Sequence, residues 1–314
     1  MAFFFVLLLL SMQETTENQQ VHLDILAQKG VDLFLKREDR IHPFISGNKY
    51  RKLKYNLEEA KTQGFDTLLT FGGAFSNHIA ATAYAGKIHG LNTIGIIRGE
   101  ELAKKWQENS TLKQAHSHGM RFKFISRTSY REKSNPEFLE HLKEEFGAFY
   151  SLPEGGTNPL AIKGCEEILR TTDADFDIVC CAVGTGGTIA GISNAAFDSQ
   201  KVLGFPALKG DFLQEDICKF ALKENWELIT GYHFGGYAKI TEELIHFLND
   251  FKIETHIPLD PIYTGKMMYG ILDLIQKDYF PPQTKILVVH SGGLQGINGM
   301  NRNLQKKNLP LINI

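Results

Sequence analysis

The sequence predicts an α/β protein in which parallel sheets are covered by helices on both faces. Three observations lead to this fold class. Apolar runs of strand length recur along the chain, most of them are followed by helical sequence, and several end in a glycine-rich turn. Because neighbouring parallel strands must be joined by a long crossover, an alternation of strand and helix is typical of a parallel sheet.

The individual elements rest on local patterns. Strands are predicted from uninterrupted apolar runs, and helices from alanine-rich or charged stretches that end at a glycine. No internal repeat or proline-rich linker marks a domain boundary, and we place one near residue 150. The predicted elements are strands at 65–73, 92–99, 121–126, 201–208 and 284–293, helices at 76–90, 100–118 and onward to 146, and a strand–turn–helix unit at 176–196.

Composition and charge exclude several classes of function. The chain has 314 residues, of which 43% are hydrophobic and 22% charged, as is ordinary for a soluble globular protein. Its net charge of −2 favours neither nucleic acid nor an anionic membrane as a partner. No C-x-x-C pair is present, so we interpret the cysteines as buried free thiols in a reducing, cytoplasmic compartment. They are Cys165, Cys180, Cys181 and Cys218.

The N-terminal segment MAFFFVLLLLSMQ needs a separate interpretation. Its apolar run of about ten residues is too short to span a bilayer. No positive charge precedes the run and no A-x-A cleavage site follows it, although its length would suit a signal peptide. Because Met12 lies just beyond it, we expect residues 1–11 to come from an upstream, non-native start, with secretion as the alternative.

The turn VGTGGTIAG, residues 183–191, is the strongest candidate for a binding site. Its glycines let the backbone approach an anion, and the helix that begins there points free N–H groups at the anion. Threonine hydroxyls add further donors. A tight strand-to-helix turn without a ligand is the alternative interpretation. The residues expected to bind are Gly184, Thr185, Gly186, Gly187 and Thr188.

Two nucleotide motifs can be tested against this turn. A dinucleotide fingerprint that starts at Gly184 requires glycine where this chain has Ile189, and no acidic residue follows about 20 positions later. A P-loop is excluded because no Gly-Lys-Ser/Thr sequence follows. The turn therefore suits a single phosphate monoester. This favours a phosphorylated cofactor over a nucleotide-dependent oxidoreductase.

The segment SGNKYRK, residues 46–52, places Lys49 in the first turn of a predicted helix. The positive partial charge of a helix N-terminus disfavours an ammonium group there. Lys49 is therefore either an ordinary surface lysine or a residue that is needed as a neutral amine. A neutral amine beside a phosphate site suits an aldehyde cofactor held as a Schiff base. Asn48 is expected to cap the helix, and Gly47 to permit the tight entry.

Six motifs now point to one family. Over residues 34–296 the sequence resembles the pyridoxal-phosphate enzymes of the 1-aminocyclopropane-1-carboxylate (ACC) deaminase and D-cysteine desulfhydrase group. Each motif is weak alone, but six in the same order over most of the chain are specific. They are LKREDRIHPFISGNKYRKLKY (35–55), FGGAFSNHIAATA (71–83), PEGGTNPLAIKG (153–164), VGTGGTIAG (183–191), LDPIYTGKMMYG (259–270) and HSGGLQG (290–296).

The resemblance implies roles for particular residues. Lys49 would form the Schiff base with pyridoxal 5′-phosphate and then serve as the general base. Asn77 would bond the phenolic oxygen of the cofactor, while Ser76 and His78 would meet the carboxylate of the substrate. Tyr263 would face the substrate. The 183–191 turn would hold the phosphate, and two further cofactor contacts are implied at Thr264 and Ser291.

The resemblance also implies an architecture. The fold would be the two-domain, tryptophan-synthase-β-like fold of pyridoxal-phosphate enzymes, known as fold type II. Residues 1–50 and 151–314 would form the large cofactor-binding domain, and residues 51–150 the small domain. The cofactor would lie in the cleft between them. A small amino acid would be the substrate, and the enzyme would be a homodimer.

Two positions bear on the choice of substrate. Thr264 stands where ACC deaminases carry a glutamate that keeps the pyridine nitrogen protonated, and His78 replaces their usual glutamine. A neutral hydroxyl supports a weaker electron sink, which suits elimination of a thiol better than opening of a cyclopropane ring. We therefore predict a D-cysteine desulfhydrase-like lyase that yields pyruvate, sulfide and ammonia. The alternative is an ACC deaminase, which yields 2-oxobutanoate and ammonia.

Departures from the family pattern leave the natural substrate open. Phe75 stands where both subgroups usually carry glutamine, and Ala80 and Ala81 replace an Arg-Gln pair. A larger, more apolar rim at Phe75 changes which side chain fits. A family member that binds amino acids without turnover is a further hypothesis, and an assay for product distinguishes it from an enzyme.

Overall fold

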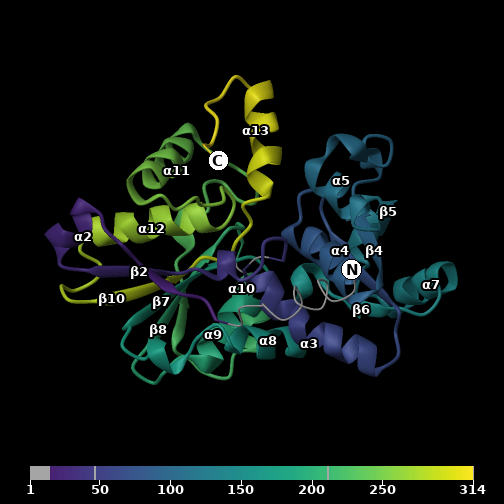
Figure 1. The fold of residues 1–314 in the computed structure, drawn as a ribbon, viewed down its shortest axis with the longest axis horizontal. Helices are drawn as coiled ribbons and strands as arrows, with labels where there is room; N and C mark the ends of the chain where they lie inside the picture. The colour runs from purple at the N-terminus through teal and green to yellow at the C-terminus, as the bar shows by residue number, and fades with distance from the viewer. Residues whose placement is uncertain (1–14, 46, 211, 314) are drawn as a thin grey trace, which may run out of the picture.

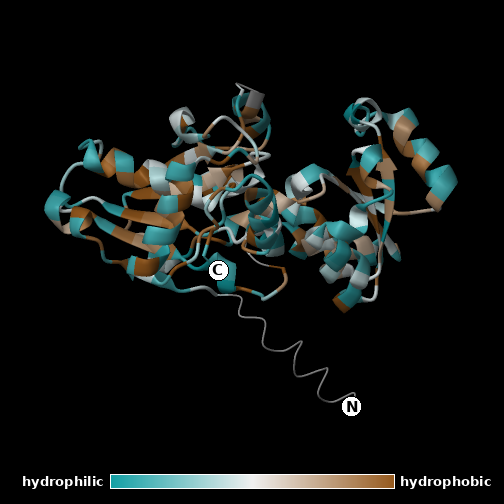
Figure 2. Ribbon diagram, turned by 90° about the horizontal axis from the view of Figure 1, so that it is seen from above, coloured by the Kyte–Doolittle hydropathy of each residue, from teal (hydrophilic) through white to brown (hydrophobic). Residues whose placement is uncertain are grey.

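The fold is built on two sheets that lie side by side in the molecule (Figure 1, Figure 2). The structure is a computed structural model that describes residues 15–45, 47–210 and 212–313. The expectation about the apolar N-terminal segment concerns residues outside these ranges. Among the described helices, none is long and apolar enough to cross a membrane.

The larger sheet has six strands, of which only the edge strand β1 is antiparallel to its neighbour. The two strands that carry the predicted ligand turns at their carboxyl ends, β7 and β10, lie next to each other in the centre of this sheet. In spatial order the strands are β1 (Asn18–Val21), β2 (Asp32–Lys36), β10 (Lys285–Val289), β7 (Ile178–Val183), β8 (Lys201–Pro206) and β9 (Trp226–Leu228).

The smaller sheet is parallel throughout and has four strands. Its strands span 67–152, so the last of them crosses the boundary that we place at residue 150. The division into a large domain (1–50 and 151–314) and a small one (51–150) stays a prediction. In spatial order the strands are β5 (Met120–Ile125), β4 (Asn92–Arg98), β3 (Thr67–Gly72) and β6 (Tyr150–Leu152).

Helices connect the strands, and two predicted helices are interrupted. The stretch predicted as one helix at 100–118 is α-helical only from residue 110, where Asn109 caps the helix by accepting a hydrogen bond from the Leu112 amide. The next predicted helix ends at Arg131, and a new helix begins at Pro136 after its N-cap Asn135. The helices are α2 (Asp24–Lys29), α3 (Asn48–Thr62), α4 (Asn77–His89), α5 (Ser110–Ser117), α6 (Arg127–Arg131), α7 (Pro136–Phe146), α8 (Pro159–Glu166), α9 (Gly187–Ala195), α10 (Phe212–Cys218), α11 (Glu242–Thr255), α12 (Thr264–Gln276) and α13 (Gly296–Lys306).

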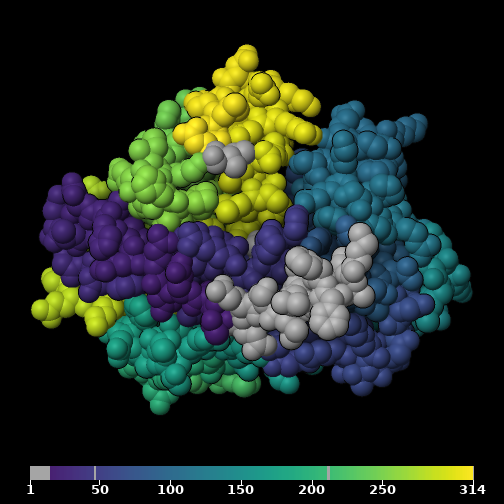
Figure 3. Space-filling model, viewed as in Figure 1, coloured from purple at the N-terminus to yellow at the C-terminus, as the bar shows by residue number. Residues whose placement is uncertain are grey.

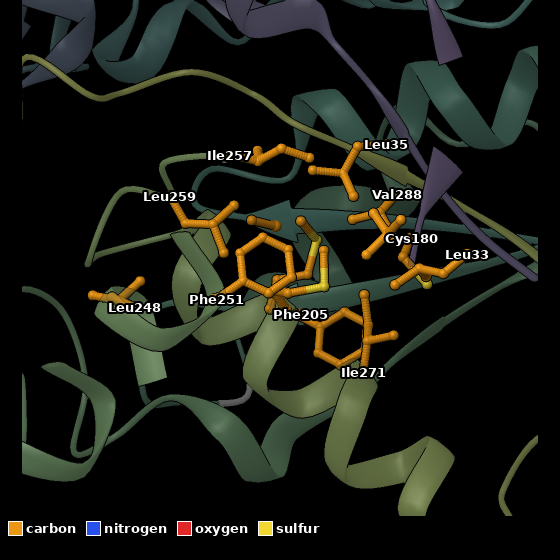
Figure 4. Close-up of a cluster of buried hydrophobic side chains, with 14 of the residues drawn as sticks. Leu33, Leu35, Cys180, Phe205, Leu248, Phe251, Ile257, Leu259, Ile271 and Val288 are labelled. Atoms are coloured by element: carbon orange, nitrogen blue, oxygen red, sulfur yellow. The ribbon is translucent and has the colours of Figure 1, made fainter. Parts of the chain in front are cut away.

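The larger sheet is buried on both faces. On one face Cys180, Phe205 and Val288 from β7, β8 and β10 pack against Ile271 of α12 and Phe251 of α11 (Figure 4). A second apolar cluster on the opposite face joins the same strands to α8 and α9. This arrangement confirms the predicted fold class of parallel sheets covered on both faces.

The cysteines correspond to the prediction with one exception. All four are free; Cys165, Cys180 and Cys181 are buried, but Cys218 is exposed. Cys218 ends the short helix α10, which follows β8 in the chain. The expectation that every thiol is buried is therefore wrong for Cys218.

Gly47 fixes the entry into α3. Its φ of +63° and ψ of −145° lie in a region that residues with a Cβ avoid. A Cβ at this position would also lie 1.8 Å from the carbonyl oxygen of Ser291, which follows β10. The amide of Gly47 donates to the Glu38 carbonyl at 2.9 Å. Glycine is therefore required here for both its backbone conformation and the close approach of two chain segments.

Replacement of Gly47 by alanine should be much more costly than an equivalent change in open space. Gly64, with φ of +75° and no described atom within 4 Å of the position that a Cβ would take, is the matched control. We expect Gly64→Ala to lower the free energy of unfolding by about 1–2 kcal/mol. Gly47→Ala should cost about 3 kcal/mol or more, because the clash with Ser291 adds to the strain. Urea unfolding followed by circular dichroism measures both, and equal costs would contradict the close contact.

Candidate active site

A cavity of about 920 Å³ lies at the carboxyl ends of the strands of both sheets. We call it the inner cavity. It brings together segments that are far apart in the sequence, including the first turns of α3, α4 and α9. Gly187 and Thr264 are the two predicted site residues that do not line it. Those that do are Lys49, Ser76, Asn77, His78, Gly184, Thr185, Gly186, Thr188, Tyr263 and Ser291.

Lys49 faces the inner cavity from the first turn of α3. Removal from bulk water, together with the positive charge of Lys52, lowers the pKa of the Lys49 amine to about 7. The interpretation of Lys49 as an ordinary surface lysine does not agree with this position. A large fraction of the amine is therefore neutral near pH 7, as nucleophilic attack on an aldehyde requires.

Asn48 has a different role from the one predicted. The residue before α3 that serves as its N-cap is Gly47, and no side chain caps this helix. The amide group of Asn48 instead donates to the hydroxyl of Thr188 at 2.7 Å. This bond joins the first turn of α3 to the first turn of α9, and it holds Lys49 beside the glycine-rich turn.

The turn before α9 forms a cradle for an anion. Gly186, with φ of +79°, precedes the helix and offers no side-chain cap, so the first amides of α9 are left without a capping acceptor. A Cβ at Gly187 would lie 2.8 Å from Thr157 Oγ1 and 3.0 Å from Lys52 Nζ. Gly187 therefore serves the site by leaving this space free, although it does not line the cavity.

Lys52 is a site residue that the sequence reasoning missed. Its side chain is 2% exposed, and its Nζ donates to Thr157 Oγ1 at 3.0 Å and to the Gly155 carbonyl at 3.2 Å. Among the described residues, no carboxylate lies within ion-pair distance of it. Its spacing of three residues from Lys49, on the same face of a helix, was the signal that could have found it. A buried, unpaired ammonium beside an uncapped helix fits a phosphate group.

The first turn of α4 offers donors for a carboxylate. Ser76 is the N-cap, and its Oγ accepts from the Ile79 amide at 3.3 Å. In the part of the chain that the structure describes, the backbone amides of Asn77 and His78 have no acceptor. The side-chain oxygen of Asn77 accepts from Gln295 at 2.8 Å, which leaves its NH₂ group as a donor toward the cavity. The capping and ligand-binding interpretations of this turn are therefore compatible.

His78 lies differently from the expectation. Its ring is 1% exposed, and its Nε2 lies 2.8 Å from the hydroxyl of Thr70. Because that hydroxyl donates to the Leu152 carbonyl at 3.0 Å, Nε2 must carry the hydrogen, and Nδ1 is an acceptor without a partner among the described residues. Burial and the charges of Lys49 and Lys52 hold the pKa of His78 well below its usual value. The ring is neutral, so the backbone amide of His78, and not its imidazole, is the group suited to a carboxylate.

Thr264 is tied to the segment before α12 and not to the cavity. The carboxylate of Asp260 accepts from the amides of Ile262, Tyr263 and Thr264, and also from the Thr264 hydroxyl at 2.8 Å. That hydroxyl accepts in turn from the Asp260 amide at 2.9 Å. The contact between Thr264 and the cofactor stays a prediction, and the hydroxyl hydrogen of Thr264 already bonds Asp260. Ser291 does line the cavity, with a partly exposed side chain.

Tyr263 lies over the glycine-rich turn. A Cβ at Gly184 would be 3.2 Å from the Tyr263 ring, and the ring centroid of Tyr237 is 6.2 Å from that of Tyr263. Burial raises the pKa of the Tyr263 phenol well above its usual value. The phenol therefore keeps its proton and can donate a hydrogen bond.

These features together define an enzyme that binds a phosphorylated aldehyde: an α/β fold, an uncapped helix with a buried ammonium at its N-terminus, and a second lysine with a lowered pKa. The family of pyridoxal-phosphate dependent enzymes matches residues 13–292. The chain belongs to this family, and its cofactor is pyridoxal phosphate. This confirms the cofactor and the fold type II architecture that the resemblance implies.

Individual relatives agree with this assignment. The bifunctional D-cysteine desulfhydrase/1-aminocyclopropane-1-carboxylate deaminase of Arabidopsis thaliana mitochondria is 34% identical over 298 residues, which cover 85% of this chain and 74% of the relative. The D-cysteine desulfhydrase of Klebsiella pneumoniae is 26% identical over 84% of this chain and 87% of its own. A crystal structure of an ACC deaminase homologue superposes with a TM-score of 0.79 at 28% identity, covering 96% of this chain and 98% of that one.

The lowered pKa of Lys49 can be measured in cofactor-free protein. Competitive acetylation as a function of pH, read by mass spectrometry of the Lys49 peptide, should give a midpoint near 7. An ordinary lysine has a pKa of about 10.4. Lys52→Met removes a like charge that disfavours the ammonium form, so the midpoint should move upward. Lys61→Met, at the other end of α3, is the control and should leave the midpoint in place; a midpoint near 10 in the unmodified protein would contradict the assignment.

Proposed function

We propose that the protein is a lyase that eliminates a thiol from a small D-amino acid, with D-cysteine giving pyruvate, sulfide and ammonia. One observation carries the choice of reaction. Among the described lining residues of the inner cavity, the carboxylates are Glu154 and Asp216, and each already pairs with a lysine, Lys133 at 3.4 Å and Lys219 at 2.6 Å. No unpaired carboxylate of this lining is left to hold the pyridine nitrogen of the cofactor in its protonated form.

A neutral hydroxyl is then the available partner for that nitrogen. Ser291 is our candidate for this partner, because it lines the inner cavity while the Thr264 hydroxyl bonds Asp260. A ring that is not fully protonated withdraws electrons less strongly, which is sufficient for loss of a thiolate but poorly suited to opening a cyclopropane ring. The names of the relatives from Arabidopsis and Klebsiella, both of which include D-cysteine desulfhydrase, support this choice.

Different residues of the inner cavity are suited to different steps of this reaction. Bound pyridoxal phosphate supplies the electron sink for negative charge at the α-carbon. The amides of the first turn of α4 hold the substrate carboxylate. Lys49, of which a large fraction is neutral near pH 7, takes the α-proton, and the protonated phenol of Tyr263 gives a proton to the departing sulfur. Water then releases ammonia, so that D-cysteine and water yield pyruvate, hydrogen sulfide and ammonia.

ACC deamination is the second candidate. The Arabidopsis relative carries that activity in its name beside desulfhydration, and the superposed crystal structure is named for it. The pairing of both lining carboxylates argues against it in this chain. We further propose a cytoplasmic homodimer, for which the three buried free thiols and the family resemblance are the support.

The proposed substrate can be tested by recording the visible spectrum of the cofactor and assaying sulfide, pyruvate and 2-oxobutanoate. In protein loaded with the cofactor, D-cysteine should shift the cofactor absorbance and release sulfide and pyruvate, whereas ACC should release no 2-oxobutanoate. Lys49→Ala should reduce sulfide formation by about 10²- to 10⁴-fold, because a general base is lost. Release of 2-oxobutanoate would overturn the preference for elimination. Cofactor absorbance that is the same in Lys49→Ala and the unmodified protein would overturn the role of Lys49.

The phenol of Tyr263 is tested by removing one oxygen atom. Tyr263→Phe should lower kcat for D-cysteine by about 10²-fold, since proton transfer to sulfur is lost while the ring remains. Tyr269→Phe is the matched control on the helix that Tyr263 precedes, because the Tyr269 hydroxyl bonds Glu243 away from the cavity. For β-chloro-D-alanine, whose chloride departs without needing a proton, Tyr263→Phe should lower kcat much less. Equal losses with both substrates would contradict a role in protonation.

A further inference from the structure

A second cavity, of about 730 Å³, adjoins the inner cavity, and we call it the outer cavity. The two share lining residues, among them Gly73, Arg98 and Tyr237. The outer cavity lies between the loops that follow β4 and β5 on one side and α13 on the other. Figure 3 shows the surface of α13 (yellow) meeting that of the smaller sheet's helices (blue), and Arg302 of α13 donates to the Glu108 carbonyl at 2.9 Å.

The outer cavity carries a large excess of positive charge. Seven cationic side chains and two carboxylates line it. Both carboxylates are already paired within the lining, Glu101 with Arg127 at 2.6 Å and Glu154 with Lys133 at 3.4 Å. The charge that remains therefore has no counterpart among the described lining residues, although the protein as a whole has a net charge of only −2.

Arg98 occupies the junction between the two cavities. It is the last residue of β4, its side chain is exposed, and no carboxylate of the described chain lies within ion-pair distance of it. Its guanidinium lies over the ring of Tyr130, 5.5 Å from the centroid. Gly73 begins the loop that leads to Ser76. A Cβ at Gly73 would lie 3.7 Å from Nη2 of Arg98. Arg98 thus stands beside the segment that we expect to hold the substrate carboxylate.

We propose that Arg98 and the outer cavity bind a second anionic group, at the far end of the substrate's leaving group. This inference rests on the proposed function, since it names the class of amino acid that the same site eliminates. A guanidinium presents a planar pair of donors that matches a carboxylate. Phe75, whose ring packs on Gly299 of α13, gives the outer cavity an apolar wall for the connecting chain.

S-carboxymethyl-D-cysteine is a substrate of this class. Its Cα–H and Cβ–S bonds break, the sulfur leaves with the bonding electrons and takes a proton, and addition of water gives pyruvate, ammonia and mercaptoacetate. No oxidation or reduction is involved. The arm beyond sulfur ends in a carboxylate, which the outer cavity would receive.

The matched comparison is S-carbamoylmethyl-D-cysteine, which has the same length but a neutral end. In the unmodified enzyme we expect kcat/KM for the carboxylate to exceed that for the amide by about 10- to 100-fold, the range for a hydrogen-bonded charge. Added salt should reduce this ratio. Arg98→Met should bring the ratio close to one. Arg121→Met is the control, because Arg121 is an exposed arginine of the neighbouring strand β5, lies over the Phe146 ring, and lines neither cavity.

Each outcome decides between the two proposals. Equal kcat/KM values for the pair, with D-cysteine still eliminated, overturn the outer-cavity inference and leave the proposed function standing. A ratio that survives in Arg98→Met overturns the role of Arg98. If no thiol is eliminated from any of the three compounds, the proposed function fails, and calorimetric binding of the pair to the cofactor-loaded protein decides the inference: tighter binding of the carboxylate that Arg98→Met abolishes supports it, and equal binding overturns it.

Discussion

Two ammonium groups, on Lys49 and Lys52, lie one helical turn apart in the same cavity with no carboxylate opposite them among the described residues. Their mutual repulsion and their loss of hydration cost free energy in the folded protein. Part of that cost is reduced because burial lowers the pKa of both amines, that of Lys49 to about 7, where a large fraction of it is neutral. An anion bound beside Lys52 would offset the rest of this free-energy cost. The site is therefore constructed around a charge that the protein itself does not supply, and a phosphate ester supplies it.

The rest of the structure holds the first turn of α3 in this unfavourable place. Gly47 touches the Ser291 carbonyl behind β10, and Asn48 bonds Thr188 at the start of α9. Arg51, one residue before Lys52, forms a buried two-bond ion pair with Glu38, whose carbonyl also accepts from Gly47. Removal of either partner of a buried ion pair leaves an uncompensated charge, which is strongly destabilising. The helix is thus fixed from the side of the larger sheet, and the backbone of Lys49 is held beside the cavity.

The sequence predicts the parts of this site that depend on backbone conformation and local order. The glycine turn at 184–187 and the lysine at a helix start can be recognised from sequence. Glycine indicates an unusual backbone conformation, and a lysine at a helix N-terminus is electrostatically unfavourable. The hydrogen-bond partners of His78 and Thr264 could not be predicted, because tertiary folding brings them from other segments. The tautomer of His78 is set by a hydroxyl on β3 and a carbonyl on β6, and Asp260 occupies the Thr264 hydroxyl. Lys52 was missed because a lysine on a charged helix is ordinary until its burial is known.

In these proposals the inner cavity carries out the reaction, and the outer cavity recognises the substrate. Neutral or nearly neutral groups, namely Lys49, His78 and the phenol of Tyr263, surround the place of reaction, where proton transfer needs pKa values matched to the medium. Permanent positive charge stands at the rim, on side chains such as Arg98 that remain in contact with solvent. Exposed charges act over about one Debye length, roughly 8 Å at physiological ionic strength, so they can attract an anion without controlling the protonation of buried groups farther in. The arrangement lets substrate selection change at the rim, at positions such as Phe75, while the acid–base groups beneath stay the same.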